Sequence, residues 1–395
     1  MTRRLLAVSI GWIGLSMLND AVPAVLLPHR VLRDGGDAST LGLVTFAAIA
    51  LAALLQPVAG AVSDRIGRVP VVGAGTLVAI GGLALLMLPG AALPAAVVAL
   101  SGASIAQAGQ QALLPDRVVD TWRGRAGGLK GAFDIGGAFV AFALLAAFLT
   151  AGRFDLGVVS LGIAVLASAL ATFVLLRSLR GRLADSMSPR TVAGAERRAL
   201  PSSLAVIAIG RFLFLLGIFA VGRFLLLFAA EVDGLPVDEA AGASSGLLAL
   251  LPLATAAASL PAGWLSDHIG RRVPMVVGSV LAGSGIGLLA SSSSLDGMFL
   301  PGLLLAGGTA LFGAASWAAL ADAVVPHEAG RMLGLANLGT AGAAAFAGLL
   351  GPLIDFAGFG LVFAIAAGLA LLGGLVSFTA SVSARALVRS IMEQS

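Results

Sequence analysis

Long apolar stretches alternate with short polar turns along almost the whole chain. A helix needs about 20 predominantly apolar residues to cross a lipid bilayer, and twelve segments of the sequence come close to this length. The predicted spans are 5–29, 39–62, 70–89, 93–114, 125–150, 156–177, 202–229, 241–264, 274–292, 297–321, 331–354 and 359–383. The pattern therefore predicts an all-α membrane protein with twelve transmembrane helices.

The only long polar stretch lies near the middle of the chain, at residues 178–200. It is rich in arginine, and six predicted spans precede it and six follow it. We therefore expect an N-terminal six-helix bundle (residues 1–177), a linker (178–200) and a C-terminal six-helix bundle (201–395).

Composition supports a membrane environment and excludes several other classes of protein. Hydrophobic residues make up 58% of the chain and charged residues only 11%, whereas soluble domains carry about 25% charged residues. The absence of cysteine excludes disulfides and thiolate metal sites. The three histidines, His29, His268 and His327, are far apart in sequence, so we expect no metal site and no cofactor.

The positive charges predict the orientation of the chain in the membrane. With the N-terminus inside, 18 of the 24 lysines and arginines lie in cytoplasmic segments, and the outer loops hold only Arg30, Arg33 and Arg153. Because positive residues concentrate on the cytoplasmic side, we expect both termini and the linker to face the cytoplasm, with the chain in the inner (cytoplasmic) membrane. The net charge of +4 comes from helix ends, so nucleic acid is not an expected partner.

The sequence contains an internal repeat. Residues 60–68 (GAVSDRIGR) and 263–271 (GWLSDHIGR) match at six of nine positions and lie 203 residues apart. A second pair of similar segments, 116–129 and 322–335, is 206 residues apart. Two motifs at nearly one offset indicate a duplicated six-helix unit, and such paired halves place a binding site between them.

The two repeated loops resemble the signature of the major facilitator superfamily, and with the helix count and linker the resemblance covers the whole chain. The matching positions are Gly60, Asp64, Arg65, Gly67 and Arg68 in the first loop and Gly263, Asp267, Gly270 and Arg271 in the second. The resemblance implies two pseudo-symmetric bundles and a secondary transporter rather than an enzyme. It also implies that the charged residues of this set form a latch that closes the cytoplasmic side. The alternative is that they only anchor the loops and set the topology.

A polar stripe in the first predicted helix is a candidate transport pathway. Trp12, Ser16 and Asp20 are spaced by four residues and share a helix face, and Asn19 lies beside them. Ionisable residues inside spanning helices are costly and indicate function, so Asp20 is a candidate proton carrier facing a cavity. The alternative is a structural hydrogen-bonding group near a kink at Pro23.

Arg223 lies 203 residues after Asp20 and so occupies the equivalent position in the second half. Gly14 and Gly217 match at the same offset. We expect Asp20 and Arg223 to pair across the cavity in one state. The alternative is an arginine near the outer helix end whose guanidinium reaches the membrane interface.

Further polar residues inside helices complete the candidate set. Lys130 and Asp134 lie one turn apart on the same helix face. One interpretation is an ion pair whose charges cancel inside the bundle. The other is that Asp134 takes up a proton, which frees Lys130 from the pair. Arg211 either reaches the cytoplasmic edge or serves transport. Gln107 and Gln111 share a face of the fourth helix and can hydrogen-bond a ligand or a neighbouring helix.

The predicted function is alternating-access transport of a small organic solute by a monomer. Proton-coupled efflux, as in the drug and metabolite exporters of the superfamily, is the first interpretation, with the lipid bilayer, the solute and protons as partners. The sequence departs from those exporters at two places. Ile105 stands where they carry an arginine, four residues before Gly109, and Ala141-Phe142 stands where they carry Gly-Pro.

Two alternatives remain. Proton-coupled uptake of an organic anion is favoured by three cations inside the helices, Arg211, Arg223 and Lys130, against Asp20 and Asp134. The other is a non-transporting membrane receptor or scaffold on the same fold. Direct coupling to ATP is not expected, because the sequence lacks a Gly-x4-Gly-Lys-Ser/Thr loop.

Overall fold

The computed structural model describes residues 2–118, 123–178, 202–323 and 329–392. Within these ranges the chain is built from helices joined by short turns, as predicted. The boundaries proposed for the linker stay a prediction, because residues 179–201 lie outside the described residues.

The first predicted helix is divided into four consecutive helical segments, and five long helices follow it. The segments are α1 (Thr2–Ser9), α2 (Gly11–Ser16), the π-helix η1 (Met17–Leu26) and α3 (Leu27–Arg33). The helices that complete the first half are α4 (Ala38–Ile66), α5 (Arg68–Leu85), α6 (Ala92–Arg117), α7 (Arg123–Thr150) and α8 (Phe154–Ser178).

The second half repeats this order without the break in its first helix. Its elements are α9 (Ser202–Asp233), α10 (Val237–Ile269), α11 (Arg272–Ala290), the short 3-10 helix η4 (Asp296–Met298), α12 (Phe299–Ala323), α13 (Ala329–Gly348) and α14 (Gly351–Met392). Eleven helices in the described part of the chain are long and apolar enough to cross a membrane, and a shorter apolar stretch, Leu338–Gly348, lies in α13.

The predicted end of the eleventh helix is wrong. The sequence pattern continued the eleventh helix to residue 354, but α13 ends at Gly348 and α14 begins at Gly351. The chain turns between them, where the Leu349 N–H donates to the Phe346 carbonyl. The turn brings Gly348 and Gly351 against the backbone of α4 at Gly42, which apolar periodicity does not reveal.

Glycines bring helices of each half into close contact, and they do so at equivalent positions of the repeat. A Cβ at any of six positions would overlap the backbone of the partner helix. These positions are Gly75, Gly82 and Gly102 between α5 and α6, and Gly278, Gly285 and Gly308 between α11 and α12. Small residues of this kind allow membrane helices to pack closely, so the duplication extends from the loop motifs to the packing.

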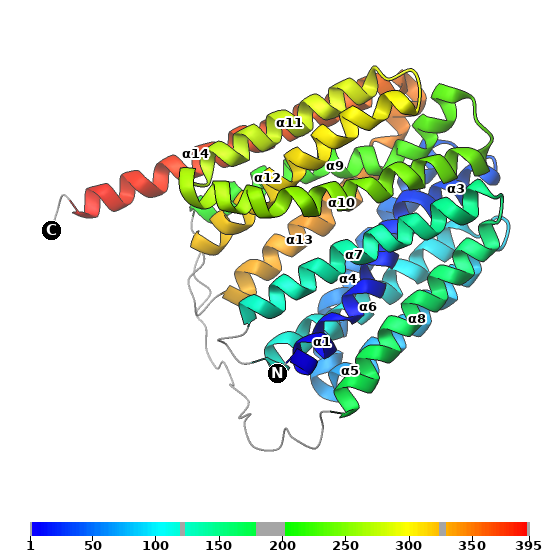
Figure 1. The fold of residues 1–395 in the computed structure, drawn as a ribbon, viewed down its shortest axis with the longest axis horizontal. Helices are drawn as coiled ribbons and strands as arrows, with labels where there is room; N and C mark the ends of the chain where they lie inside the picture. Colours follow the sequence, from blue (N-terminus) through cyan, green and yellow to red (C-terminus); the bar gives the residue numbers. More distant parts are fainter. Residues whose placement is uncertain (1, 119–122, 179–201, 324–328, 393–395) are drawn as a thin grey trace.

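The two halves meet at one end of the molecule and separate toward the other (Figure 1). We call the end that holds α3 and the start of α10 the convergent end. The divergent end holds the turns between α4 and α5 and between α10 and α11. Gly67 and Gly270 make these two turns with φ values of 98° and 85°, a region that only glycine enters readily.

The segmented first helix lies deep inside the structure. Of the residues in its apolar membrane-spanning stretch, 72% are buried, whereas only 22% are buried in the corresponding stretch of α10. Its polar stripe therefore faces protein or an internal space rather than lipid.

Candidate functional site

A cavity of about 360 Å³ lies between the two halves. Most of its lining is apolar, which is typical of sites for small organic ligands. Its polar and charged lining residues are Ser16, Asn19, Asp20, Asp134, Arg223, Thr255 and Thr309. Five of these seven belong to the set predicted from the sequence.

The first half provides Asp20 from the π-helix. The Ser16 hydroxyl donates a 2.7 Å hydrogen bond to Asp20 Oδ2. These two residues of the predicted polar stripe therefore share one face of the helix. The segment is wider than an α-helix because the Leu27 N–H bonds the Val22 carbonyl, five residues back. Pro23 lies inside this segment and has no N–H to donate. π-Helical turns of this kind frequently occur at functional sites.

Helix α7 contributes a second carboxylate. Asp134 lines the cavity, and its Oδ2 lies 4.0 Å from Lys130 Nζ, one turn away on the same helix. Lys130 Nζ also lies 3.9 Å from the centroid of the Trp12 ring. Trp12 and Lys130 do not line the cavity but lie behind Asp134, which does. The ammonium group of Lys130 partly offsets the charge of Asp134.

The polar residues of α6 support the site rather than line it. Gln107 accepts a 3.1 Å hydrogen bond from the side-chain amide of Asn19, so it orients a lining residue. Gln111 is half-buried and does not line the cavity. Sequence reasoning missed Gln110, which is fully buried and donates to the Val8 carbonyl at 3.0 Å. Gln110 lies off the helix face that holds Gln107 and Gln111, so the spacing of polar residues did not indicate its role.

The second half contributes Arg223. This side chain is only 4% exposed, so the alternative that it reaches the membrane interface is wrong. Arg223 Nη1 donates to the Pro23 carbonyl at 3.0 Å, and Nη2 donates to the Ala344 carbonyl at 3.3 Å. The guanidinium therefore bridges the halves through backbone oxygens, while Asp20 is bonded to Ser16.

Arg211 occupies a separate buried place and does not line the cavity. Its Nη1 donates to the Ser316 hydroxyl at 2.7 Å, and its guanidinium carbon lies 4.4 Å from the centroid of the Trp317 ring. Only 8% of the residue is exposed. Arg211 is thus held inside the second half and does not extend to the membrane edge.

The repeated loops at the divergent end form matching ion pairs within each half. Arg68 pairs with Asp64 and also donates to Asp116 Oδ2 at 2.8 Å. Arg271 pairs with Asp267 at the equivalent position of the second half. Among the other motif positions, Arg65 is exposed, and the space beside Gly60 and Gly263 is open.

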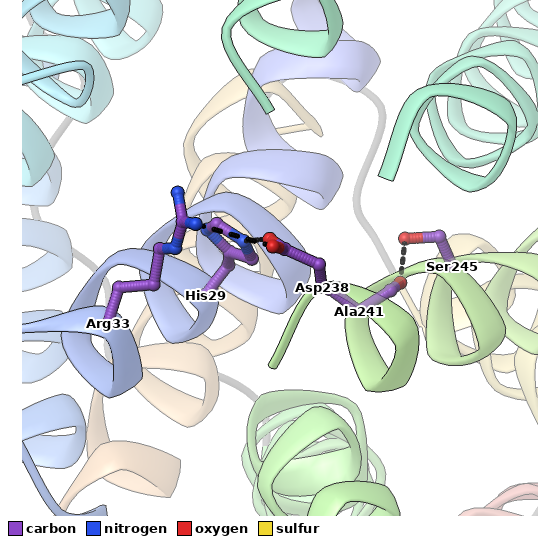
Figure 2. Close-up of polar contacts among 5 residues, drawn as sticks. All are labelled: His29, Arg33, Asp238, Ala241 and Ser245. Carbon is purple, nitrogen blue, oxygen red and sulfur yellow. Dashed lines mark hydrogen bonds and ion pairs between the residues drawn. The ribbon is translucent and has the colours of Figure 1, made fainter. Parts of the chain in front are cut away.

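The convergent end joins the halves through residues that sequence reasoning did not select. His29 of α3 is fully buried, its ring stacks on Phe154 at 4.2 Å, and its Nε2 lies 2.7 Å from Asp238 Oδ1 of α10. Figure 2 shows Asp238 pointing toward both His29 and Arg33, and Arg33 Nη2 lies 3.3 Å from Asp238 Oδ2. Nothing in the spacing of these residues, more than 200 apart in sequence, could have predicted the contact.

Two further contacts close this end. The carboxylate of Asp355 in α14 accepts hydrogen bonds from the N–H groups of Ala38 and Ser39, at 3.2 and 2.7 Å, and so caps the start of α4 from the other half. A Cβ on Gly42 would overlap the backbone of Gly348, so the helices touch there without side chains between them.

The turn between α3 and α4 is stabilised within the first half. Asp34 pairs with Arg30 and accepts a 3.1 Å hydrogen bond from the Gly90 N–H. The hydrogen bond from Arg30 lowers the pKa of Asp34 below its usual value. Within the described residues, no three His, Asp or Glu side chains lie close enough to hold a metal ion.

Comparisons with solved structures support the fold. The chain is similar to a POT family transporter in complex with a thioalcohol-conjugated peptide, with a TM-score of 0.76 and 15% identity over 97% of this chain and 96% of the other. It is also similar to a POT family transporter in complex with 5-aminolevulinic acid, with a TM-score of 0.72 and 13% identity over 95% of each chain. At these identities the likeness concerns the fold alone.

Comparisons of sequence extend this to the family. The chain is 32% identical over 178 residues to an uncharacterized MFS-type transporter of Schizosaccharomyces pombe, a match that spans 43% of this chain and 39% of that relative. The family model of the Major Facilitator Superfamily matches residues 12–252 and 207–393. The resemblance inferred from the repeated loops is thereby confirmed, and the chain belongs to the Major Facilitator Superfamily.

Proposed function

We propose that this multi-pass membrane transporter exports a small organic solute in exchange for protons. The observation that carries the proposal is the cavity between the halves, which two carboxylates of one half and a guanidinium of the other line together. A largely apolar wall with a few charged groups suits an amphipathic organic solute. Carboxylates that face such a cavity can bind and release protons as it opens to either side.

The arginine distribution supports an orientation for the cycle. It assigns the divergent end to the cytoplasm, because positive residues favour that side. The structure then corresponds to an inward-facing state in which the convergent end is closed toward the outside. The solute enters from the cytoplasm, and the charged residues of the motif loops latch the divergent end when the convergent end opens. Protons from outside then bind Asp20 and Asp134 and promote release.

Transport into proteoliposomes with an imposed pH gradient tests both coupling and direction. A proton antiporter accumulates its solute when the vesicle interior is acidic, whereas a proton symporter accumulates it when the exterior is acidic. Tetraphenylphosphonium, benzoate and dialanine serve as cationic, anionic and peptide probes; the last reflects the peptide bound by one of the similar structures. We expect accumulation of the cation with an acidic interior, beyond that in protein-free liposomes held at the same membrane potential.

Variants of the carboxylates assign the proton sites. Asp20→Asn and Asp134→Asn are expected to lose accumulation driven by the pH gradient while keeping counterflow, which needs no gradient. Asp155→Asn is the matched control, because Asp155 is exposed at the start of α8 and lies outside the cavity. Gradient-driven accumulation that is unchanged in both cavity variants would exclude these residues as proton sites.

Uptake of an organic anion is the second candidate function. Arg223 favours it, because it carries a buried positive charge at the cavity wall and its present acceptors are neutral carbonyls. Accumulation of benzoate with an acidic exterior, in excess of that in protein-free liposomes with the same pH gradient, would support this candidate over efflux.

A further inference from the structure

We propose that Arg223 is a positioning residue that holds the convergent end closed by binding the carbonyl of Pro23. This inference goes beyond the proposed function, because it depends on neither the solute nor the coupling ion. It rests on the local geometry of η1, on the burial of Arg223 and on the place of the contact between the halves.

The carbonyl of Pro23 has no donor within its own helix. In an α-helix the donor would be the N–H of Leu27, but that group bonds the Val22 carbonyl instead. In the five-residue register of a π-helix the donor would be residue 28, which is a proline and has no N–H. The spacing of Pro23 and Pro28 therefore leaves one backbone acceptor free inside the membrane.

A free carbonyl in this environment needs a partner from elsewhere. An unsatisfied backbone group costs several kcal/mol in the absence of water, and Arg223 supplies the missing donor at 3.0 Å. The arginine is itself almost fully buried, and its Nη2 donates a second hydrogen bond to the Ala344 carbonyl in its own half. The bond satisfies the Pro23 carbonyl and one of the donors of the buried guanidinium, whose Nε has no hydrogen-bond partner in the described part of the chain. It crosses from α9 to η1.

The position of this bond makes it part of the closed end. Pro23 follows Asp20 by three residues in the direction of His29, so the contact lies between the proton-binding candidate and the convergent end. Both Pro23 and Arg223 line the cavity. The halves cannot separate at the convergent end without breaking this bond, so its strength biases the equilibrium between the two states of the transporter.

Electron-spin distance measurements on the full chain in lipid nanodiscs test the proposal. The sequence contains no cysteine, so Leu88→Cys and Ser293→Cys give specific labels on exposed turns at the convergent end of each half. A second pair, Ile66→Cys and Ile269→Cys, reports the divergent end. No solute or pH gradient is needed, so failure here is separable from failure of the transport proposal.

We expect Arg223→Gln to raise the ratio of open to closed convergent ends on the order of tenfold, because it removes hydrogen bonds made by a charged donor. The distances at the convergent end should lengthen while those at the divergent end shorten. Arg153→Gln removes an exposed arginine from a loop at the same end and should leave both distributions unchanged.

Pro28→Ala tests the same idea without altering the arginine. It returns an N–H to the helix, which can bond the Pro23 carbonyl and compete with Arg223. We expect a shift in the same direction of about threefold, since only one of the hydrogen bonds is weakened. Pro94→Ala, at an exposed position in the first turn of α6, is the matched proline control.

Two results would overturn the proposal. One is a folded Arg223→Gln variant whose distance distributions are the same as those of the Arg153→Gln control. The other is a Pro28→Ala variant that stays as closed as the Pro94→Ala control. The second variant keeps the proposal open to refutation even if Arg223→Gln does not fold.

Discussion

The two ends of the molecule use charged residues in opposite ways. At the convergent end, Asp238 and Asp355 of the second half bind side chains and backbone N–H groups of the first half. At the divergent end, Arg68 and Arg271 each pair with an aspartate of their own half. Charges that are satisfied within one half leave the halves free to move apart, whereas charges satisfied across the boundary resist separation. The comparison therefore predicts that substitutions at the convergent end alter the conformational equilibrium most.

The largest effect is expected from Gly42→Val. A Cβ at this position would overlap the backbone of Gly348, and the two helices would have to move apart. Overpacking typically costs about 1–3 kcal/mol, and overlap with backbone, which cannot rotate away, places this site at the upper end, so counterflow in proteoliposomes should fall at least tenfold. Gly81→Val is the matched control, because the space beside Gly81 is open. Full counterflow in Gly42→Val would contradict the close contact of the helices.

A smaller effect is expected from Asp238→Asn. The variant loses the charge that faces both His29 and Arg33, and hydrogen bonds to charged groups contribute about 1.5–3 kcal/mol. Because asparagine still accepts a hydrogen bond, we expect roughly a tenfold rise in the open population. The maleimide labelling rate of Ala38→Cys measures it, since Ala38 is 3% exposed in the closed form. Glu239→Gln, at the exposed neighbouring position, should label at the original rate.

Asp355→Asn should shift the equilibrium less. Its carboxylate caps α4 across the boundary, and charge at a helix N-terminus contributes about 0.3–1 kcal/mol. The N-terminus keeps its own cap, because Asp37 accepts a hydrogen bond from the Thr40 N–H at 2.8 Å. We expect labelling of Ala38→Cys to rise about threefold. A larger rise than in Asp238→Asn would reverse the proposed ranking of the two contacts.

The smallest effect is expected at the divergent end, from Asp116→Asn. Asp116 is 39% exposed in its side chain and pairs with Arg68, which keeps Asp64 as a second partner. Partly exposed pairs contribute about 1 kcal/mol or less, so the temperature of unfolding in detergent should fall by only a few degrees. The labelling rate of Ala38→Cys should not change. An increase comparable to that of Asp238→Asn would mean that the two ends are not distinct.

The fold and most of the polar lining of the cavity followed from patterns that a sequence displays directly. Hydrophobic length gives the helices, the repeated loops give the duplication, and spacing by four places Ser16 and Asp20 on one face. Each of these three inferences depends on residues that are close together in sequence or separated by one fixed offset. The family and the membrane fold were predictable for that reason.

The contacts between the halves were not predictable, because they join residues with no shared pattern. His29 and Asp238 are 209 positions apart, and each alone resembles an ordinary polar residue near a helix end. The partner of Arg223 is a backbone carbonyl, which side-chain patterns cannot show. Pro23 suggested a kink, but the π-helical register depends on how the freed carbonyl is satisfied by another helix.

The contact of Gly42 with Gly348 and Gly351 has a consequence for leakage. Where two helices meet backbone to backbone, there is no side chain whose rotation could open a file of water molecules. Such a seal would retain a membrane potential as well as large solutes, because hydrated protons could not pass between the helices. The three glycines would then limit the dissipation of the proton gradient through a transporter that is not carrying solute.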